Sequence, residues 1–177
     1  HGNSARAIFA YITYAVIEVA AFGAFESGGH FGRLAESLLE ELDAKNFQAK
    51  LSLMLGGYIT HWQDHIRTTL PSLITGYQTG LETGDLSFAV NCLLGHSVNS
   101  FFVGRPLEDI EQELNKSVQI INQVKEQTYL HYHKQYHQVV LNWLGQSETT
   151  YDLRGGVYND CLLYTYTSPR DTAISRM

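Results

Sequence analysis

The amino-acid sequence predicts an all-α fold in which antiparallel helical hairpins stack as an α-solenoid with a period of about 40 residues. Three observations support this prediction. Only 3 prolines occur in 177 residues, and a proline inside a helix breaks it. Apolar residues recur at steps of three and four, as they do along one face of a helix. No stretch shows the sustained alternation of apolar and polar residues that is typical of β-strands.

Four helices are predicted in the N-terminal half, over residues 4–22, 28–43, 46–64 and 67–82. The first overlaps a nearly continuous apolar run from Ala7 to Phe25, AIFAYITYAVIEVAAFGAF, which is almost long enough to span a bilayer. Glu18 near the middle of this run disfavours a membrane span, because a charge there costs roughly 2.5–3.5 kcal/mol on insertion. We therefore expect a buried repeat helix. The Gly28-Gly29 pair at the start of the second helix is interpreted as a turn.

Three helices are predicted in the C-terminal half, over residues 86–103, 106–124 and 127–144. Gly84 indicates a helix stop, and Asp85 indicates the N-cap of the helix that follows. Gly104 ends that helix, and Pro106 suits the first position of the next one. Acidic residues in the first turn after Pro106 complement the positive end of the helix dipole.

The first helix of each predicted hairpin ends at a regular interval. The ends lie 41, 40 and 41 residues apart, at Gly23, near Asp64, at Gly104 and at Gly145. A period of this length with two helices per unit is typical of helical solenoids. Small residues in the middle of the first helices predict points where neighbouring backbones approach closely. These residues are Ala15, Gly56, Gly57 and Gly95.

The chain is predicted to have two parts. Residues 1–158 form a helical-repeat segment, which we expect to be a fragment of a larger protein because both ends of the stack lack an obvious polar cap. Residues 159–177 form an irregular tail in which the apolar periodicity disappears. The sequence from Cys161 onward, CLLYTYTSPRDTAISRM, resembles a translated sequencing adapter, so we expect this tail to be non-native.

Composition argues against several classes of function. The net charge of −6 and the lack of any Lys or Arg run disfavour nucleic acid as a partner, since phosphate binding needs a basic surface. Two cysteines, Cys92 and Cys161, form neither a disulfide framework nor a zinc-binding spacing, so a reducing cytoplasmic location is expected. No phosphate-binding glycine motif occurs, and no cofactor is predicted.

Histidines are the residues that most suggest chemistry. His61 and His65, like His133 and His137, stand four residues apart and would share one face of a helix. Neither pair has the adjacent glutamate of the zinc-protease motif, and two ligands are too few for a zinc site. Cys92 lies among apolar residues and is interpreted as an inert core side chain. We therefore predict no metal and no catalytic residue, and a metal-dependent enzyme is the least favoured alternative.

Aromatic residues allow two interpretations. The chain has 11 Tyr, 8 Phe and 2 Trp, and the favoured interpretation places them in the solenoid core, which needs large side chains. The alternative is a concave groove for a protein partner, in which Trp, Tyr and Arg act as anchors. The candidate partner-binding residues are Tyr58, Trp62, His65, Arg67, Tyr77, Tyr132, Tyr136 and Trp143.

Several segments resemble one known family. These are Ile59-Thr60-His61-Trp62 with His65, Ile66 and Arg67; the run from Gly80 to Leu86; Phe101-Phe102-Val103-Gly104; and Val140 to Gly145. They are similar to the tetratricopeptide-like helical region of large bacterial hybrid signalling proteins, which are frequent in cyanobacteria. Such proteins combine a serine/threonine kinase, a STAND-type AAA ATPase, helical repeats, a GAF domain and a sensor histidine kinase. The likeness extends from about Tyr14 to Tyr158.

The resemblance implies a non-catalytic scaffold for protein interaction and signal relay, in which phosphoryl transfer takes place in other domains. None of the family's kinase or ATPase motifs lies in this chain, so no catalytic residue is carried over. The expected partners are flanking domains of the same protein or another signalling protein. A stand-alone tetratricopeptide-like adaptor is the main alternative.

Overall fold

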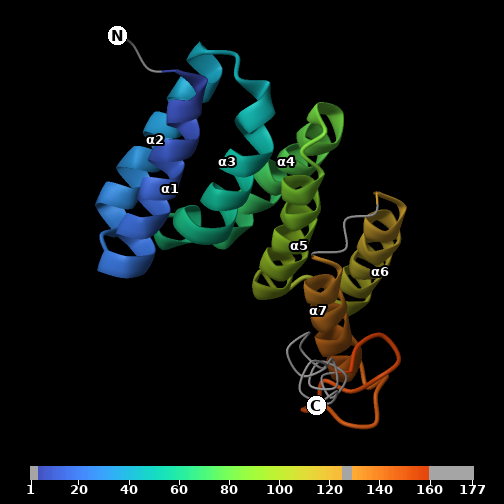
Figure 1. Cartoon of the computed structure of the whole chain (residues 1–177). Coiled ribbons are helices and arrows are strands. Elements are labelled where there is room, and N and C mark those ends of the chain that lie inside the picture. The colour runs from blue at the N-terminus through green and yellow to red at the C-terminus, as the bar shows by residue number, and fades with distance from the viewer. Residues whose placement is uncertain (1–3, 125–128, 160–177) are drawn as a thin grey trace, which may run out of the picture.

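The computed structural model describes residues 4–124 and 129–159, and this part of the chain is all-helical, without a β-strand (Figure 1). Residues 160–177, which make up nearly all of the predicted non-native tail, lie outside it. The α-helices are α1 (Ala5–Phe22), α2 (Phe25–Glu41), α3 (Gln48–Met54), α4 (Thr69–Thr83), α5 (Leu86–Phe102), α6 (Leu107–Val124) and α7 (Leu130–Trp143).

Six of the seven predicted helices are present, with ends shifted by a few residues, but the one predicted over 46–64 is not a single α-helix. It begins as a 3₁₀ turn at Lys45–Phe47 and continues as α3. It then widens into a π-helical turn at Leu55–Ile59 and ends in a 3₁₀ turn at Thr60–Trp62. The adjacent Gly56 and Gly57 explain the change, because two glycines in succession weaken an α-helix.

The interpretation of Gly28 and Gly29 as a turn is wrong. Both are buried inside α2, and the turn lies before them at Gly23, whose φ of 63° ends α1 in the left-handed region. A Cβ at Gly28 would lie 2.9 Å from the carbonyl oxygen of Ala15. Gly28 therefore lets α2 approach the backbone of α1, which confirms Ala15 as a point of close contact.

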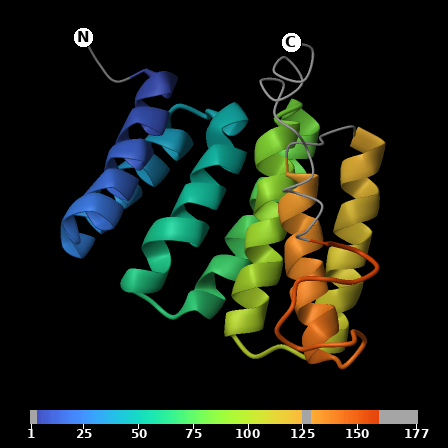
Figure 2. The same ribbon diagram turned by 60° about the horizontal axis from the view of Figure 1, so that its bottom comes forward.

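Consecutive helices pack beside one another, and the odd-numbered helices also form a row. Contacts join α1 to α3, α3 to α5, and α5 to α7. Helices α2, α4 and α6 each pack against the odd-numbered helix that precedes them, and α4 and α6 also pack against the one that follows. Figure 2 shows the row from α1 at one side to α7 at the other. The same end of every odd-numbered helix therefore lies along one edge of the molecule.

Aliphatic side chains fill the core. The largest cluster joins α1, α2 and α3, and its buried members include Ile8, Ile12, Ala15, Ala35, Leu38, Leu51 and Leu55. Leu73 of α4 occupies space left by two glycines: a Cβ at Gly56 would lie 2.9 Å from Leu73 Cγ, and one at Gly95 would lie 3.3 Å from Leu73 Cδ2. The close contact at Gly56 and at Gly95 is thus with the side chain of Leu73, and not with a neighbouring backbone as predicted. The same prediction is wrong for Gly57, where no atom lies within 4 Å of a Cβ.

Among the described residues, one helix, α1, is long and apolar enough to cross a bilayer, and 22% of that segment is buried within the protein. Its buried face carries Ile8, Ile12 and Val19. Core helices and signal sequences meet the same criteria of length and composition, so these criteria do not place α1 in a membrane.

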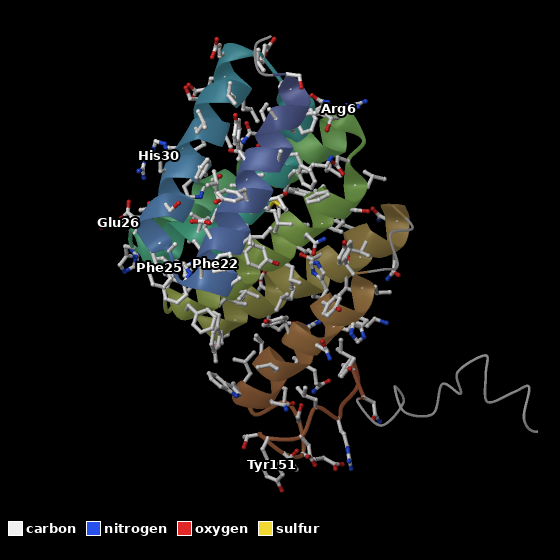
Figure 3. The ribbon with its side chains drawn as sticks, turned by 60° about the vertical axis from the view of Figure 1, so that its left-hand side comes forward. Arg6, Phe22, Phe25, Glu26, His30 and Tyr151 are labelled. Carbon is white, nitrogen blue, oxygen red and sulfur yellow. The ribbon has the colours of Figure 1, made fainter. Side chains whose placement is uncertain are left out.

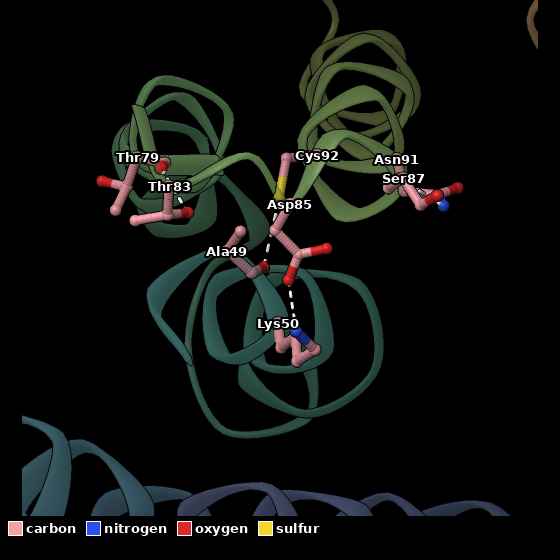
Figure 4. A network of polar contacts seen from close by, with 8 residues as sticks. All are labelled: Ala49, Lys50, Thr79, Thr83, Asp85, Ser87, Asn91 and Cys92. Atoms are coloured by element: carbon pink, nitrogen blue, oxygen red, sulfur yellow. Dashed lines mark hydrogen bonds and ion pairs between the residues drawn. The ribbon is translucent and has the colours of Figure 1, made fainter. Parts of the chain in front are cut away.

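Polar contacts join α3 to the start of α5 (Figure 4). Asp85 stands at the N-cap position of α5 as predicted, but its side chain makes no capping hydrogen bond and instead pairs with the ammonium group of Lys50. Cys92 Sγ donates to the carbonyl oxygen of Ala49 at 3.4 Å. Cys92 is fully buried, which confirms its predicted place in the core, and burial raises the pKa of its thiol to about 12.

Candidate functional site

Most of the predicted partner-binding residues lie at the surface. Tyr58, Trp62, Tyr132, Tyr136 and Trp143 are between 42% and 57% exposed. His65 and Arg67 are also exposed, whereas Tyr77 of α4 is half-buried. The interpretation of these aromatics as solenoid core is therefore wrong. The physical reason is that aliphatic side chains and close-packed glycines already fill the space between the helices.

These residues do not form one site. Tyr58, Trp62, His65 and Arg67 lie in the segment that ends the α3 region and leads into α4. Tyr132, Tyr136 and Trp143 lie along α7. The two groups share one structural feature: each contains a tryptophan that is the last residue of its helical segment.

Two phenylalanines that were not predicted as site residues occupy the equivalent position in the other odd-numbered helices. Phe22 is the last residue of α1 and is 73% exposed; Phe102 is the last residue of α5 and is 68% exposed. Phe22, Trp62, Phe102 and Trp143 are 40, 40 and 41 residues apart. We call these four residues the aromatic edge. The signal in the sequence that could have identified the aromatic edge is an aromatic residue one or two positions before each predicted helix end.

Each tryptophan of the aromatic edge contacts a ring of a neighbouring hairpin; Trp62 is stacked on its partner, and Trp143 is tilted by 54° against its partner. Trp62 lies 4.6 Å, centroid to centroid, from Phe25 at the start of α2, with an interplanar angle of 25°. Trp143 lies 4.9 Å from Phe101 of α5. Figure 3 shows Phe22 and Phe25 together at one end of the α1–α2 hairpin. Each pair bridges two hairpins and leaves much of the indole open to solvent.

A groove of about 560 Å³ lies between α5 and the segment that leads from α3 into α4. We call it the edge groove; its lining residues are Gly57, His61, Asp64, His65, Ile66, Val98, Asn99 and Phe102. Gly57 belongs to the π-helical turn, and the space above it is empty. Asn99 is fixed by hydrogen bonds from its Nδ2 to the carbonyl oxygen of Gly56 at 3.0 Å and to Thr69 Oγ1 at 2.7 Å. π-Helical turns are frequent at functional sites.

An apolar slot of about 70 Å³ adjoins the edge groove. It lies between α5, α6 and α7 and is lined by Ser97, Val98, Phe101, Phe102, Ile110, Leu114, Tyr136, Val139 and Val140. Val98 and Phe102 line both the slot and the groove. This slot also brings the predicted residue Tyr136 close to the aromatic edge.

The edge groove is weakly acidic. Asp64 is the one carboxylate among its lining residues, and its Oδ1 accepts a hydrogen bond from the backbone N–H of His65 at 2.7 Å. Burial lowers the pKa of His61, so this ring is uncharged at neutral pH. The groove therefore offers apolar surface together with one negative charge.

The four histidines of the two predicted pairs lie in different surroundings. His61 lies in the 3₁₀ turn Thr60–Trp62, whereas His65 has an extended backbone and precedes the 3₁₀ turn Ile66–Thr68, so the two do not share a helix face. His133 is fully buried and donates from Nε2 to the carbonyl oxygen of Val90 at 3.0 Å. His137 Nε2 lies 2.9 Å from Glu111 Oε1. Across residues 4–124 and 129–159, no three His, Cys, Asp or Glu side chains gather closely enough to hold a metal ion.

Comparison with known proteins gives one signalling relative. No protein-family model matches the chain, and no solved structure matches it. Over 128 residues, 72% of this chain, the sequence is 25% identical to Hybrid signal transduction histidine kinase G of Dictyostelium discoideum. The matched part is 4% of that protein's length. The chain is therefore similar to a small part of a signal-transduction protein.

Proposed function

We propose that this chain is a non-catalytic helical-repeat scaffold, which mediates protein interaction and signal relay inside a larger ATPase and kinase signalling protein of the cytoplasm. Its similarity to a small part of a hybrid histidine kinase supports a place within a signalling protein. Such a segment would relay signals by binding flanking domains on its surface. Interfaces between domains of one chain resemble transient protein–protein interfaces, so the domains can move relative to one another.

The observation that carries this proposal is the periodic aromatic edge. Four exposed aromatic residues, spaced 40, 40 and 41 positions apart, are the last residues of the four helical segments in the odd-numbered row. Equivalent residues at equivalent places in successive hairpins support a tetratricopeptide-like solenoid. Aromatic residues are also enriched at protein interfaces, and Trp is among the residues that most often anchor a partner.

A non-catalytic role is supported by the state of the groups that could react. The Cys92 thiol is buried, and burial raises its pKa to about 12, so thiolate chemistry is strongly disfavoured. His133 and His137 are held by hydrogen bonds within the α5–α6–α7 region. The lining of the edge groove contains a single carboxylate, that of Asp64.

The proposal is tested by titrating the 177-residue chain with each flanking domain from its full reading frame. Both tryptophans of the chain belong to the aromatic edge, so their emission reports directly on contact there. Saturable binding with a blue shift of that emission is the expected result. No change with any flanking domain, at concentrations up to about 1 mM, corresponding to a binding free energy weaker than about −4 kcal/mol, would overturn the relay proposal.

A further inference from the structure

We propose that two copies of this chain form a dimer through the exposed face of α1, in which the two α1 helices pack antiparallel about a two-fold axis. This inference goes beyond the scaffold function and concerns a different face of the molecule from the edge groove. It is carried by an exposed apolar helix face, by the order of the residues along that face, and by two charges near its ends.

Helix α1 has apolar residues on two sides, and the protein packs only one of them. The buried residues of α1 belong to the cluster that joins α1, α2 and α3. On the other side, Phe9 is 37% exposed, and Tyr14 and Ile17 are each 46% exposed. A helix that is apolar all round is normally buried on every side. The exposed side of α1 therefore indicates a surface that receives a partner.

The residues on this side stand at the spacing of paired helices. Ala10, Tyr14, Ile17 and Ala21 are all exposed, and they are separated by steps of four, three and four. Residues at these steps form the seam along which two helices pack. We call these four residues the α1 seam. At a rise of about 1.5 Å per residue, the seam is about 16 Å long.

The α1 seam is complementary to itself when a second copy runs in the opposite direction. Its residues are small, large, large and small in chain order, so reversal of the helix leaves the order unchanged. Tyr14 of each copy then lies opposite Ile17 of the other, and Ala10 lies opposite Ala21. Reciprocal pairing of this kind is what a two-fold interface between identical chains requires. This symmetry favours a second copy over an unrelated partner.

Charged residues near the two ends of α1 fit the same arrangement. Arg6 is exposed in the first turn of α1, and Glu26 is exposed in the first turn of α2, just beyond the end of α1. Figure 3 shows Arg6 at one end of α1 and Glu26, with Phe22, toward the other. A two-fold axis at the middle of the seam brings Arg6 of each copy toward Glu26 of the other. These opposite charges favour the antiparallel direction.

Glu18 is the one acidic residue of α1, and the antiparallel pair accommodates it. Its carboxylate has a side-chain hydrogen bond with Tyr14, so it keeps a partner when a second copy covers this face. The pairing places Glu18 opposite Thr13 of the other copy. The two Glu18 residues are then five positions apart along the helix axis, about 7.5 Å. Like charges are thereby kept from facing each other.

A lipid surface fits the charge of this face less well than a second copy does. Helices that lie on membranes are rich in Lys and Arg on their polar side. Arg6 is the one basic residue of α1, and the whole chain has a net charge of −6. Anionic lipids would therefore repel this protein.

The exposed area predicts a weak dimer. Phe9, Tyr14 and Phe22 are 37%, 46% and 73% exposed, so their rings offer roughly 250–400 Å² per copy. Ile17 and the exposed alanines add to this area. Both copies together then bury roughly 1,000 Å², which is the lower limit for a specific interface. We expect a dimer that dissociates at micromolar concentrations.

Sedimentation velocity of the 177-residue chain, from about 1 μM to about 1 mM, tests the proposal. The expected result is a reversible rise in mass that stops at twice the monomer mass, because a two-fold interface is closed. A constant monomer mass over this range would overturn the proposal, and so would growth beyond the dimer. Neutral phosphatidylcholine vesicles are added in a parallel run. Vesicle binding by a chain that does not dimerise would assign this face to a bilayer instead.

A seam variant and a matched control locate the interface on α1. Ile17→Glu introduces a charge at the middle of the seam and should weaken dimerisation at least about tenfold. Tyr151→Glu introduces the same charge at an 83% exposed position outside α1 and should leave dimerisation unchanged. Circular dichroism and melting temperatures check that both variants are folded. Native dimerisation in a folded Ile17→Glu chain would reject the seam.

Exchange of the two end charges tests the antiparallel direction. Arg6→Glu and Glu26→Arg should each weaken dimerisation about fivefold, since each replaces two exposed ion pairs by like charges. The chain with both changes should recover the native affinity, because the charges again face opposite partners. A double variant that dimerises no better than the single ones would contradict the proposed arrangement.

Discussion

The side-chain amide of Gln63 occupies the space that a side chain at Gly29 would need. A Cβ at Gly29 would lie 1.7 Å from Gln63 Nε2. That Nε2 donates to the backbone carbonyl oxygen of Phe25 at 2.6 Å, and Gln63 Oε1 accepts from Arg33 at 3.2 Å. Gln63, which follows Trp62 in the chain, is thereby hydrogen-bonded to α2. The first residue of α2, Phe25, stacks on Trp62.

Alanine at Gly28 and at Gly29 should have different effects on stability. At Gly28 the new Cβ would meet the backbone oxygen of Ala15, which cannot move alone, so Gly28→Ala should lower the free energy of unfolding by about 1–3 kcal/mol. At Gly29 it would meet the flexible end of Gln63. Loss of the Gln63 hydrogen bonds is then offset by about 1 kcal/mol of helix propensity. Urea unfolding of both variants measures the difference; equal losses would contradict this account.

The Lys50–Asp85 pair should contribute to the contact between α3 and α5. Their side chains are 26% and 19% exposed, and Lys50 Nζ also lies 4.9 Å from the ring centroid of Phe88. Asp85→Ala should cost about 1–3 kcal/mol because it leaves a mostly buried ammonium without its partner. Lys50→Met should also destabilise the chain, because the Asp85 carboxylate, which is only 19% exposed, loses its partner even though the apolar stem at position 50 is kept. A double-mutant cycle with the Lys50→Met, Asp85→Ala chain gives the coupling energy; a value near zero would show the pair to be unimportant.

Stability should fall as the pH drops from about 6.5 to about 4, partly because of His133. Burial lowers the pKa of His133 to about 4, below its ordinary value of 6.5. Between these values the unfolded chain binds the proton and the folded chain does not, so acid favours unfolding. The full effect of this one group is about 3 kcal/mol. Urea unfolding at pH 7.5, 6 and 5 measures the slope.

His133→Leu is the variant that isolates this contribution. It should reduce the acid sensitivity, whereas His30→Gln, at an exposed position of α2, should leave it unchanged. Burial also lowers the pKa of His96, which adds to the effect in the same direction and remains in both variants. An identical pH slope in the native chain and in His133→Leu would rule out the role given to His133.

The phenylalanines of the aromatic edge should contribute little to folding. Phe22→Ser and Phe102→Ser replace rings that are 73% and 68% exposed, and such surface changes usually alter stability by less than about 0.5 kcal/mol. Both variants should instead be more soluble, because an exposed apolar surface is reduced. Thermal melts and light scattering measure the two effects. A large loss of stability in either variant would assign the ring to the core.

The helix pattern could be predicted from the sequence because it depends on local signals. Apolar spacing located six helices, and Gly23, Gly104 and Gly145 have positive φ angles at the ends of α1, α5 and α7. Gly56 and Gly57 were predicted to act alike, yet one is packed against Leu73 and the other faces open space. That difference depends on tertiary contacts, which spacing alone does not determine.

The aromatic residues were harder to place for a related reason. Their size favours burial on average, so Trp62 and Trp143 were assigned to the core. Their positions at the ends of helical segments put them beyond the packed interior, and aliphatic residues at helical spacing fill that interior instead. The position of an aromatic residue relative to the helix end was more informative than its type. Phe22 and Phe102 have the same position at a helix end, and both are exposed.

The π-helical turn at Leu55–Ile59 also determines the direction in which the later side chains of its segment point. Each residue of an α-helix turns the chain by about 100°, so one residue more or less redirects every later side chain by that angle. Deleting Gly57 would allow the turn to close into ordinary α-helix and would rotate Trp62 away from Phe25. The length of this segment, as well as its composition, therefore determines whether the ring pair at this edge can form.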